Sequence, residues 1–314
     1  MMNILSADIG GTNSRFAYFK FDSQKNLTMI DAIDFKTTDV KSFPELLEHL
    51  KQSRFQLKFE ECDTAVFGVA GPVKNNVYCN PPNIPWDIDV SNSFSELGLR
   101  QCILINDFVA QAYACRTSAV ASAISIQKGN ADPAGTIAVI GAGTGLGCCA
   151  LFPIQETRFI AIPSEGGHAS FSFMGKEEKQ YEQFVIDKTK QQYCETGTIV
   201  SGIGLAMLHE FLTGECLTPD QVALTFHPES KTLKWFSRFY GRVCRNYALT
   251  AYASGGLYIT GGIAAKNQVL ITDSNFLSEF HLSYTFGGFL ASIPVFLNHN
   301  ESSGLYGAAF YGVI

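Results

Sequence analysis

The chain has 314 residues, of which 46% are hydrophobic and 17% are charged, and its formal net charge at pH 7 is −6. This length suits two domains better than one. The acidic balance excludes the basic surface that nucleic acids and anionic membranes attract. We therefore expect a protein that acts on small molecules, with neither nucleic acid nor a membrane as a partner.

The cysteines and the first residues indicate the compartment. Nine cysteines lie along the chain without a paired metal spacing, and their odd number favours buried free thiols in a reducing cytosol. The N-terminal segment lacks the basic residues of a secretion signal, so we expect a cytoplasmic protein. The uncharged run 135–152 contains five glycines, which is typical of a buried hairpin rather than a membrane span.

In chain order, apolar runs at 2–7 and 15–21 predict two strands around the glycine turn Asp8-Ile9-Gly10-Gly11-Thr12-Asn13. A capping-box pattern, Ser42 to Glu45, opens a predicted helix. Further buried strands are predicted at 65–69 and 102–105, and a helix from 108 to about 116 follows the latter. Ligands of open α/β sheets bind beyond the carboxyl ends of the strands, so Asn106 and Asp107 stand where chemistry is expected.

The second half repeats this scheme. It contains a second hairpin, Gly141-Ala142-Gly143-Thr144-Gly145-Leu146-Gly147, predicted helices at 202–212 and 233–253, and a strand at 257–260 that ends in Gly261-Gly262. A C-terminal helix runs through Leu305, Ala308 and Ala309. We expect an α/β fold of two duplicated lobes with an active-site cleft between them. Residues 1–133 form the smaller lobe and 134–314 the larger, and the last helix is able to return to the first lobe.

Both glycine hairpins are candidate phosphate-binding loops, because glycine lets backbone N–H groups converge on phosphate oxygens. A dinucleotide fingerprint fails because the sixth position from Gly141 is Leu146, and the only Gly-Lys pair, Gly175-Lys176, is followed by Glu177 rather than Ser or Thr. A glycine turn between two strands is typical of actin-like ATPases. For one turn alone the alternative is an ordinary tight hairpin, which the second copy disfavours.

Polar side chains at the turns are candidate ligands. Asp8 stands where a carboxylate holds Mg²⁺ beside phosphates, directly or through water, and its alternative is a turn-capping aspartate. For Asn106-Asp107 the alternative is an ordinary helix cap. Glu165 and His168, in Ser164-Glu165-Gly166-Gly167-His168, offer the acceptors and donors that sugar hydroxyls need. The alternative for His168 is a structural loop histidine.

Five segments occur here in the order of bacterial glucokinases, at 8–13, 105–108, 141–147, 165–168 and 261–263. The sequence resembles this family over nearly its whole length, and it resembles the branch that carries no zinc site. The resemblance implies the fold of actin, heat-shock proteins and hexokinases. It also implies transfer of a phosphoryl group from ATP to the 6-hydroxyl of glucose, with ATP and Mg²⁺ but no zinc.

The resemblance also implies roles for individual residues. Asp107 is the general base, and the sugar ligands are Asn83, Asn106, Asp107, Glu165 and His168, with Trp86 near the sugar loop. Asp8 holds magnesium, and the nucleotide ligands are Asp8, Ile9, Gly10, Gly11, Thr12, Asn13, Gly141, Gly143, Thr144, Gly145, Gly261 and Gly262. Gly197 stands where the family carries a sugar-binding glutamate, four residues before a Ser-Gly pair. Glu195 is the expected replacement, which leaves hexose selectivity open.

Other functions remain alternatives. One is a hexose-binding sensor or regulator with little turnover, which only Gly197 supports, and another is a kinase for mannose, glucosamine or fructose. An actin-like or chaperone-like ATPase lacks the Asn-Asp and Glu-Gly-Gly-His segments. The sequence fixes neither the phosphoryl donor nor the oligomeric state, of which a homodimer is one option.

Overall fold

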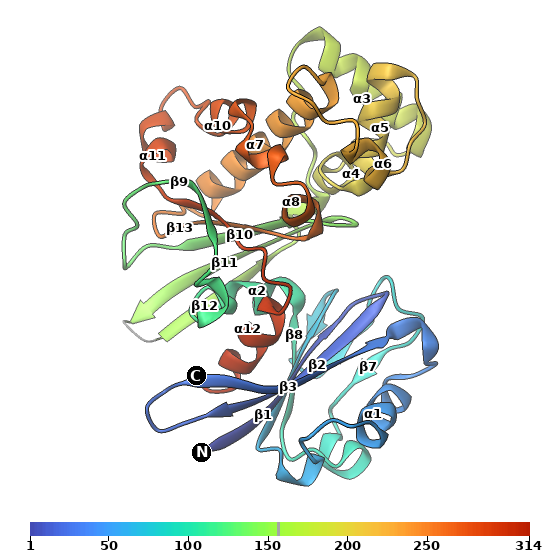
Figure 1. The fold of residues 1–314 in the computed structure, drawn as a ribbon, viewed down its shortest axis with the longest axis vertical. Helices are drawn as coiled ribbons and strands as arrows, with labels where there is room; N and C mark the ends of the chain where they lie inside the picture. The colour runs from blue at the N-terminus through green and yellow to red at the C-terminus, as the bar shows by residue number, and fades with distance from the viewer. Residues whose placement is uncertain (156–157) are drawn as a thin grey trace. The chain divides into compact units, whose positions relative to one another are not determined.

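The computed structural model describes residues 1–155 and 158–314 (Figure 1). The chain divides into two compact units: a first unit of residues 1–122 and 300–314, and a second unit of residues 123–299. The boundary lies earlier than the expected residue 133, because β9 (Ile124–Gln127) pairs with β14 (Val295–Leu297) and so belongs to the second sheet. The C-terminal helix α12 (Ser303–Tyr311) lies in the first unit.

A five-stranded sheet in the order β3-β2-β1-β4-β8 forms the centre of the first unit. Strands β1, β2 and β3 are antiparallel neighbours, whereas β1, β4 and β8 are parallel. The strands predicted at 2–7, 15–21, 65–69 and 102–105 are confirmed, and β3 was not predicted. The bounds are β1 (Met2–Ile9), β2 (Asn13–Phe21), β3 (Leu27–Lys36), β4 (Thr64–Val69) and β8 (Cys102–Asn106).

The second unit repeats this pattern in a six-stranded sheet, ordered β12-β11-β10-β13-β14-β9. Strands β12, β11 and β10 are antiparallel neighbours, and β10, β13 and β14 are parallel. Each sheet therefore joins an antiparallel triplet to parallel strands, which confirms the predicted duplication. The bounds are β10 (Ile137–Ala142), β11 (Leu146–Gln155), β12 (Arg158–Ser164) and β13 (Gly256–Thr260). A small sheet in the first unit contains β5 (Val73–Lys74), β6 (Tyr78–Cys79) and β7 (Ile88–Asp89).

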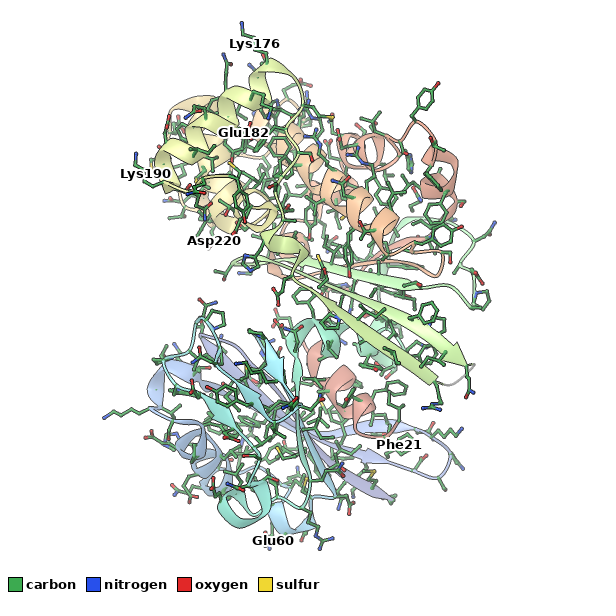
Figure 2. All side chains as sticks on the ribbon, turned by 180° about the vertical axis from the view of Figure 1, so that it is seen from behind. Phe21, Glu60, Lys176, Glu182, Lys190 and Asp220 are labelled. Carbon is green, nitrogen blue, oxygen red and sulfur yellow. The ribbon has the colours of Figure 1, made fainter. Side chains whose placement is uncertain are left out.

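Helices cover the sheets of both units (Figure 1). Those of the first unit are α1 (Phe43–Gln52), α2 (Asp107–Ala114) and α12. Those of the second are α3 (Gly175–Thr189), α4 (Thr196–Ile199), α5 (Gly202–Thr213), α6 (Pro219–Ala223), α7 (Lys231–Thr250), α8 (Gly262–Lys266), α9 (Val269–Thr272), α10 (Ser274–Phe280) and α11 (Gly287–Ser292). The predicted helices near 108–116, 202–212 and 233–253 are confirmed. Figure 2 shows Lys176 and Lys190 at the ends of α3 pointing away from the core.

The first sheet buries side chains on both faces. On one face Leu5, Ala7 and Ile9 of β1 pack in the cluster that includes the buried residues of α1. On the other face Ile4 packs with Leu305 and Ala309 of α12. Because successive side chains of a strand alternate between faces, Ser6 and Asp8 share the α12 side of β1 with Ile4.

Two helices on that side, α12 and α2, are in direct backbone contact. A Cβ on Gly307 of α12 would lie 1.7 Å from the carbonyl oxygen of Ala110 and 2.7 Å from the amide nitrogen of Ala114. Any larger residue at 307 would push the two helices apart. This contact fixes the position of α12 over the end of β1.

A buried ionic cluster joins three helices of the second unit. The fully buried Arg242 of α7 donates to both carboxylate oxygens of Glu178, at 2.6 and 3.1 Å, and to Oε1 of Glu279 at 2.8 Å. Burial by itself would raise the pKa of Glu178, but hydrogen bonds from Arg242 and the Met174 amide, with the Arg242 and Arg238 charges, lower it below its usual range. Arg242 also donates to the carbonyl of Ser172 at 2.8 Å, so the cluster holds the segment that follows Glu165-Gly166-Gly167-His168.

We expect Gly307→Ala to destabilise the protein by about 1–3 kcal/mol, the usual cost of overpacking a buried contact. The added methyl group has no space beside Ala110. The free energy of unfolding in urea measures this. The control is Gly288→Ala in α11, where a Cβ meets nothing within 4 Å, so replacing this helical glycine is expected to stabilise by roughly 0.5–1 kcal/mol. Equal midpoints for both variants would contradict the prediction.

Candidate functional site

The first glycine turn joins β1 to β2 and is held by its own backbone and by Thr37. The amide of Gly10 donates to the carbonyl of Asn13 at 3.0 Å. The hydroxyl of buried Thr37 donates to the Gly10 carbonyl at 2.7 Å, and its amide donates to the Thr12 carbonyl at 2.9 Å. The side chains of Thr12 and Asn13 are exposed. Sequence analysis missed Thr37, because nothing in its local pattern marks it as the brace of a turn 25 residues away.

Gly11 explains why the segment with Asn83 lies beside this turn. A Cβ on Gly11 would lie 2.8 Å from the Asn83 carbonyl oxygen and 2.9 Å from its Cβ. Trp86 anchors the same segment, because its buried indole donates to the Val40 carbonyl at 3.3 Å. Because Gly11 has no side chain, the segment with exposed Asn83 can pack directly against the predicted phosphate-binding turn. Gly11 is therefore explained by packing within the protein.

Asp8 is a carboxylate in a desolvated position at the end of β1. Its Oδ2 lies 3.2 Å from the position that a Cβ of Gly304 would occupy. Burial raises the pKa of Asp8, the Arg15 charge lowers it by less, and the Asp34 charge raises it further. A hydrogen bond between the backbones of Gly10 and Asn13 closes the turn. The alternative interpretation of Asp8, as a turn-capping aspartate, gave this role to its carboxylate. A desolvated, half-buried carboxylate of this kind favours a cation as its neighbour.

The start of α2 separates the roles of Asn106 and Asp107. The side-chain oxygen of Asn106 accepts from the amides of Phe108 at 2.9 Å and Val109 at 3.3 Å, so Asn106 is the N-cap. Its amide nitrogen donates to the Gly71 carbonyl at 3.1 Å. Asp107 is the first helical residue and is half-buried. The alternative that Asp107 is itself the cap is therefore wrong.

The second glycine turn, at the tip of the β10–β11 hairpin, contains glycines of two kinds. A Cβ on Gly141 would lie 2.8 Å from Cγ2 of Thr260, and one on Gly261, which has a φ of +89°, would lie 2.5 Å from the Ala142 carbonyl oxygen. These two glycines allow close packing. A Cβ on Gly143 or Gly145 would meet nothing within 4 Å. The open tip, which also carries exposed Thr144, is the part of the hairpin able to accept a ligand.

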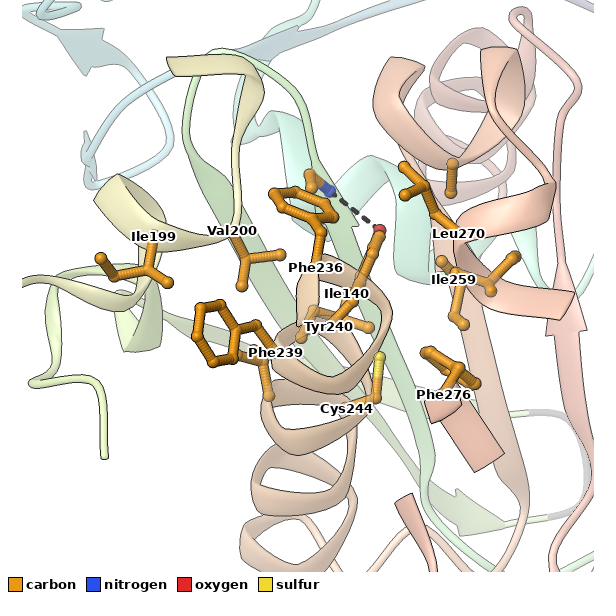
Figure 3. Close-up of a cluster of buried hydrophobic side chains, with 14 of the residues drawn as sticks. Ile140, Ile199, Val200, Phe236, Phe239, Tyr240, Cys244, Ile259, Leu270 and Phe276 are labelled. Carbon is orange, nitrogen blue, oxygen red and sulfur yellow. Dashed lines mark hydrogen bonds between the residues drawn. The ribbon is translucent and has the colours of Figure 1, made fainter. Parts of the chain in front are cut away.

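The core of the second unit supports this hairpin from below. Figure 3 shows Tyr240 of α7 rising from the apolar cluster toward the end of β10. Its hydroxyl oxygen accepts a hydrogen bond from the amide of Ala142 at 3.4 Å. Tyr240 is fully buried, so the last residue of β10 before the tip is tied to the longest helix of the unit.

Three predicted sugar ligands meet in the second unit. Nδ1 of His168 lies 3.0 Å from Oε2 of Glu195, and Nε2 of His168 lies 3.8 Å from Oε2 of Glu165. The imidazole and the Glu165 side chain are about 70% exposed, whereas Glu195 is 27% exposed. Sequence analysis missed Tyr193, whose hydroxyl donates to the His168 carbonyl at 3.2 Å. The cluster therefore presents two carboxylates and one imidazole to solvent.

The backbone of Leu146 joins this cluster to the glycine hairpin. A Cβ on Gly167 would lie 2.0 Å from the Leu146 carbonyl oxygen. A Cβ on Gly197 would lie 3.2 Å from both the Gly167 carbonyl oxygen and the Leu146 amide nitrogen. Gly197 is thus explained by packing, and Glu195 is the position from which a carboxylate reaches His168.

Three properties of the described residues complete the site. All nine cysteines are free thiols, and eight of them are buried as predicted, but Cys216 is exposed. Within residues 1–155 and 158–314, no group of three or more His, Cys, Asp or Glu side chains is placed to hold a metal ion. No helix in that part of the chain has the length and apolar character needed to cross a membrane.

Known proteins with similar sequences and structures include several glucokinases. The glucokinase of Nostoc sp. (strain PCC 7120) is 31% identical, with 98% of each chain covered, and that of Campylobacter jejuni subsp. doylei is 30% identical, with 97% of this chain and 92% of its own length covered. The crystal structure of a glucokinase from an Antarctic psychrotroph is 28% identical and superposes with a TM-score of 0.84, covering 100% of this chain and 99% of that one.

A more distant structure shares the fold alone. The ROK family glucokinase from Streptomyces griseus, in complex with glucose and AMPPNP, superposes with a TM-score of 0.65 at 15% identity and covers 99% of both chains. The duplicated sheets are those of the actin-like ATPase fold, as expected. A profile described as Glucokinase matches residues 5–313. This chain therefore belongs to the glucokinase family.

Proposed function

We propose that this protein transfers the γ-phosphoryl group of ATP to the 6-hydroxyl of glucose, giving glucose 6-phosphate and ADP. The observation that carries the proposal is the packing of Gly167 and Gly197 on Leu146. This packing fixes the distance between two groups of residues. The first group is two carboxylates and an imidazole, which are typical sugar ligands. The second is the open glycine tip, which is typical of a phosphate-binding loop. Membership of the glucokinase family supports glucose and ATP as the substrates.

The sugar is held by Glu165, His168 and Glu195, with Asn83 and Asn106 as further ligands. Hydrogen bonds to charged acceptors are worth about 1.5–3 kcal/mol each. A hexose with one hydroxyl inverted leaves such a group unpaired, so these residues also distinguish epimers. Glu195 contributes most to this selectivity, because its side chain is less exposed than those of Glu165 and His168 and its carboxylate is oriented by His168.

Asp107 acts as the general base. Because Asn106 caps α2, the Asp107 carboxylate is not needed for that role. Phosphoryl transfer has a loose transition state, so the base accepts the hydroxyl proton late and needs no raised pKa. A general base of this kind contributes roughly 10²–10⁴-fold to the rate.

ATP is bound by the two glycine turns and by Gly261-Gly262, and Asp8 would hold Mg²⁺ directly or through water. Asp8 fits this role, because it is a desolvated carboxylate beside the first turn. Mg²⁺ is usually bound by one or two carboxylates together with substrate phosphates, so a larger ligand cluster is not required. When bound, the ion would neutralise charge on the phosphate oxygens. Asp8 itself orients the ion.

We also propose a cytoplasmic role in glycolysis, which the free thiols and the acidic composition support. The sensor alternative rested on Gly197 alone, and the packing of Gly197 against Leu146 accounts for that residue. No observation favours another hexose. A homodimer stays an open prediction.

We expect Asp107→Asn to lower kcat by roughly 10²–10⁴-fold, the contribution of a general base, while the affinity for glucose stays nearly unchanged. A coupled assay and equilibrium glucose binding measure the two quantities. Asp220→Asn is the matched control, because Asp220 also lies in the first turn of a helix, α6. Activity of Asp107→Asn within tenfold of the unaltered protein would remove Asp107 from the catalytic role.

We expect Gly143→Ala to weaken ATP binding about tenfold, a loss of about 1.4 kcal/mol, and to leave glucose binding unchanged. The added methyl group has open space in the free protein, so the loss arises only when a phosphate approaches. Calorimetric titration with each ligand tests this, with Gly288→Ala as the control. Equal losses for ATP and glucose would indicate a distorted hairpin instead.

We expect Glu195→Gln to raise the KM for glucose about tenfold and to change the ratio of glucose to mannose turnover. The amide keeps the shape of the side chain, but a hydrogen bond to a neutral acceptor is about half as strong as one to a carboxylate. Exposed Glu177 in α3 provides the control, Glu177→Gln. If the KM and the ratio both remain unchanged, Glu195 does not bind the sugar.

A further inference from the structure

Three elements of the first unit converge beside Asp8. Asp8 is the penultimate residue of β1, Gln111 lies in α2, and Gly304 lies in the first turn of α12. A Cβ on Gly304 would lie 3.2 Å from Oδ2 of Asp8 and 3.4 Å from Nε2 of Gln111. The contact of Gly307 with Ala110 fixes this arrangement, because Gly304 is one turn before Gly307 and Gln111 directly follows Ala110.

Gln111 carries an acceptor that the protein leaves unused. Its Oε1 is buried and has no hydrogen-bond partner among the described residues. The same holds, within that part of the chain, for the hydroxyl oxygen of Ser6, which lies on the same side of β1 as Asp8. A buried polar atom without a partner destabilises the folded protein. The region beside Asp8 thus contains two buried oxygens whose hydrogen bonds the described residues do not supply.

The acceptors match one kind of occupant. A carboxylate near a side-chain amide with an unpaired oxygen suits a hard divalent cation that keeps part of its water shell, because the carboxylate takes the charge and the amide oxygen accepts from a bound water. The amide adds no second negative charge to the desolvated Asp8. Gln111 also lies four residues after Asp107, so both side chains lie on one face of α2.

We propose that Gln111 is a positioning residue for the cation held by Asp8, and that its Oε1 accepts a hydrogen bond from a water molecule of the hydrated divalent ion that accompanies the nucleotide. This inference rests on the proposed function, because the ion arrives with ATP. One face of α2 then carries both the base and a group that orients the ion.

The test measures binding of Mn²⁺ to the complex of the enzyme with ADP by electron paramagnetic resonance. We expect Gln111→Met, which keeps the length of the side chain and removes the acceptor, to weaken Mn²⁺ about tenfold or more, the usual effect of losing a group that orients a metal site. Binding of ADP in EDTA should not change. Gln52→Met in α1 is the control, because Gln52 is an exposed glutamine of the same unit.

Two further variants keep the test decisive if Gln111→Met does not fold. Gln111→Glu should bind Mn²⁺ more tightly, because it adds a charge to the same position. Gly304→Ala should weaken Mn²⁺, because its methyl group presses on Asp8 and Gln111. Mn²⁺ affinity within twofold of the unaltered protein in the Gln111 variants would overturn the inference and assign the unpaired atoms to a structural water.

The same experiment separates this inference from the proposed function. The Mn²⁺ measurement contains no sugar and requires no turnover. A protein that fails to phosphorylate glucose but loses Mn²⁺ affinity on Gln111→Met would contradict the function and support the inference. A protein that phosphorylates glucose, but whose Mn²⁺ affinity does not change on Gln111→Met, would support the function and contradict the inference.

Discussion

The close approach of three backbone segments at Leu146 is the constraint on which the second half of the site depends. Gly167 and Gly197 both contact the main chain of Leu146, and a Cβ at Gly167 would lie only 2.0 Å from its carbonyl oxygen. Leu146 is also the first residue of β11 after the glycine tip. The hairpin, the turn that carries His168 and the helix that follows Glu195 therefore cannot move independently. This rigidity is what a preorganised site for a polar sugar requires.

The first unit uses the same principle with different partners. Gly307 lets α12 touch α2, and Gly11 lets the first turn touch Asn83. Most glycines near the predicted site therefore permit contacts within the protein, and they cannot be counted as phosphate contacts on sequence grounds. Gly143 and Gly145 differ, because a Cβ at either position would meet nothing within 4 Å. The motif thus combines glycines that build the turn with glycines that leave it open.

Local patterns in the sequence predict the parts of this structure that depend on local physics. Alternating and continuous apolar runs located most strands of both sheets, whereas the sugar-binding role of Glu195, which lies 3.0 Å from His168, stays a prediction. Contacts between distant segments carry no local signal. Thr37 holds the turn that follows β1, β9 joins the second sheet through β14, and the Gln111 amide and the Asp8 carboxylate both lie beside Gly304 because α12 packs against α2. These contacts could be found only from the three-dimensional structure.

The proposed cation site at Asp8 lies where its free groups lower the stability of the folded protein. The folded pKa of Asp8 lies above its unfolded value, mainly because of burial. The ionised carboxylate therefore lowers stability at every pH above that folded pKa, and the loss disappears below the unfolded value. The unpaired oxygen of Gln111 adds a second cost at the same place. A cation beside Asp8 would remove both, because it favours the ionised carboxylate and brings water to the amide. A cation that bound beside Asp8 would therefore recover the free energy that this part of the protein loses.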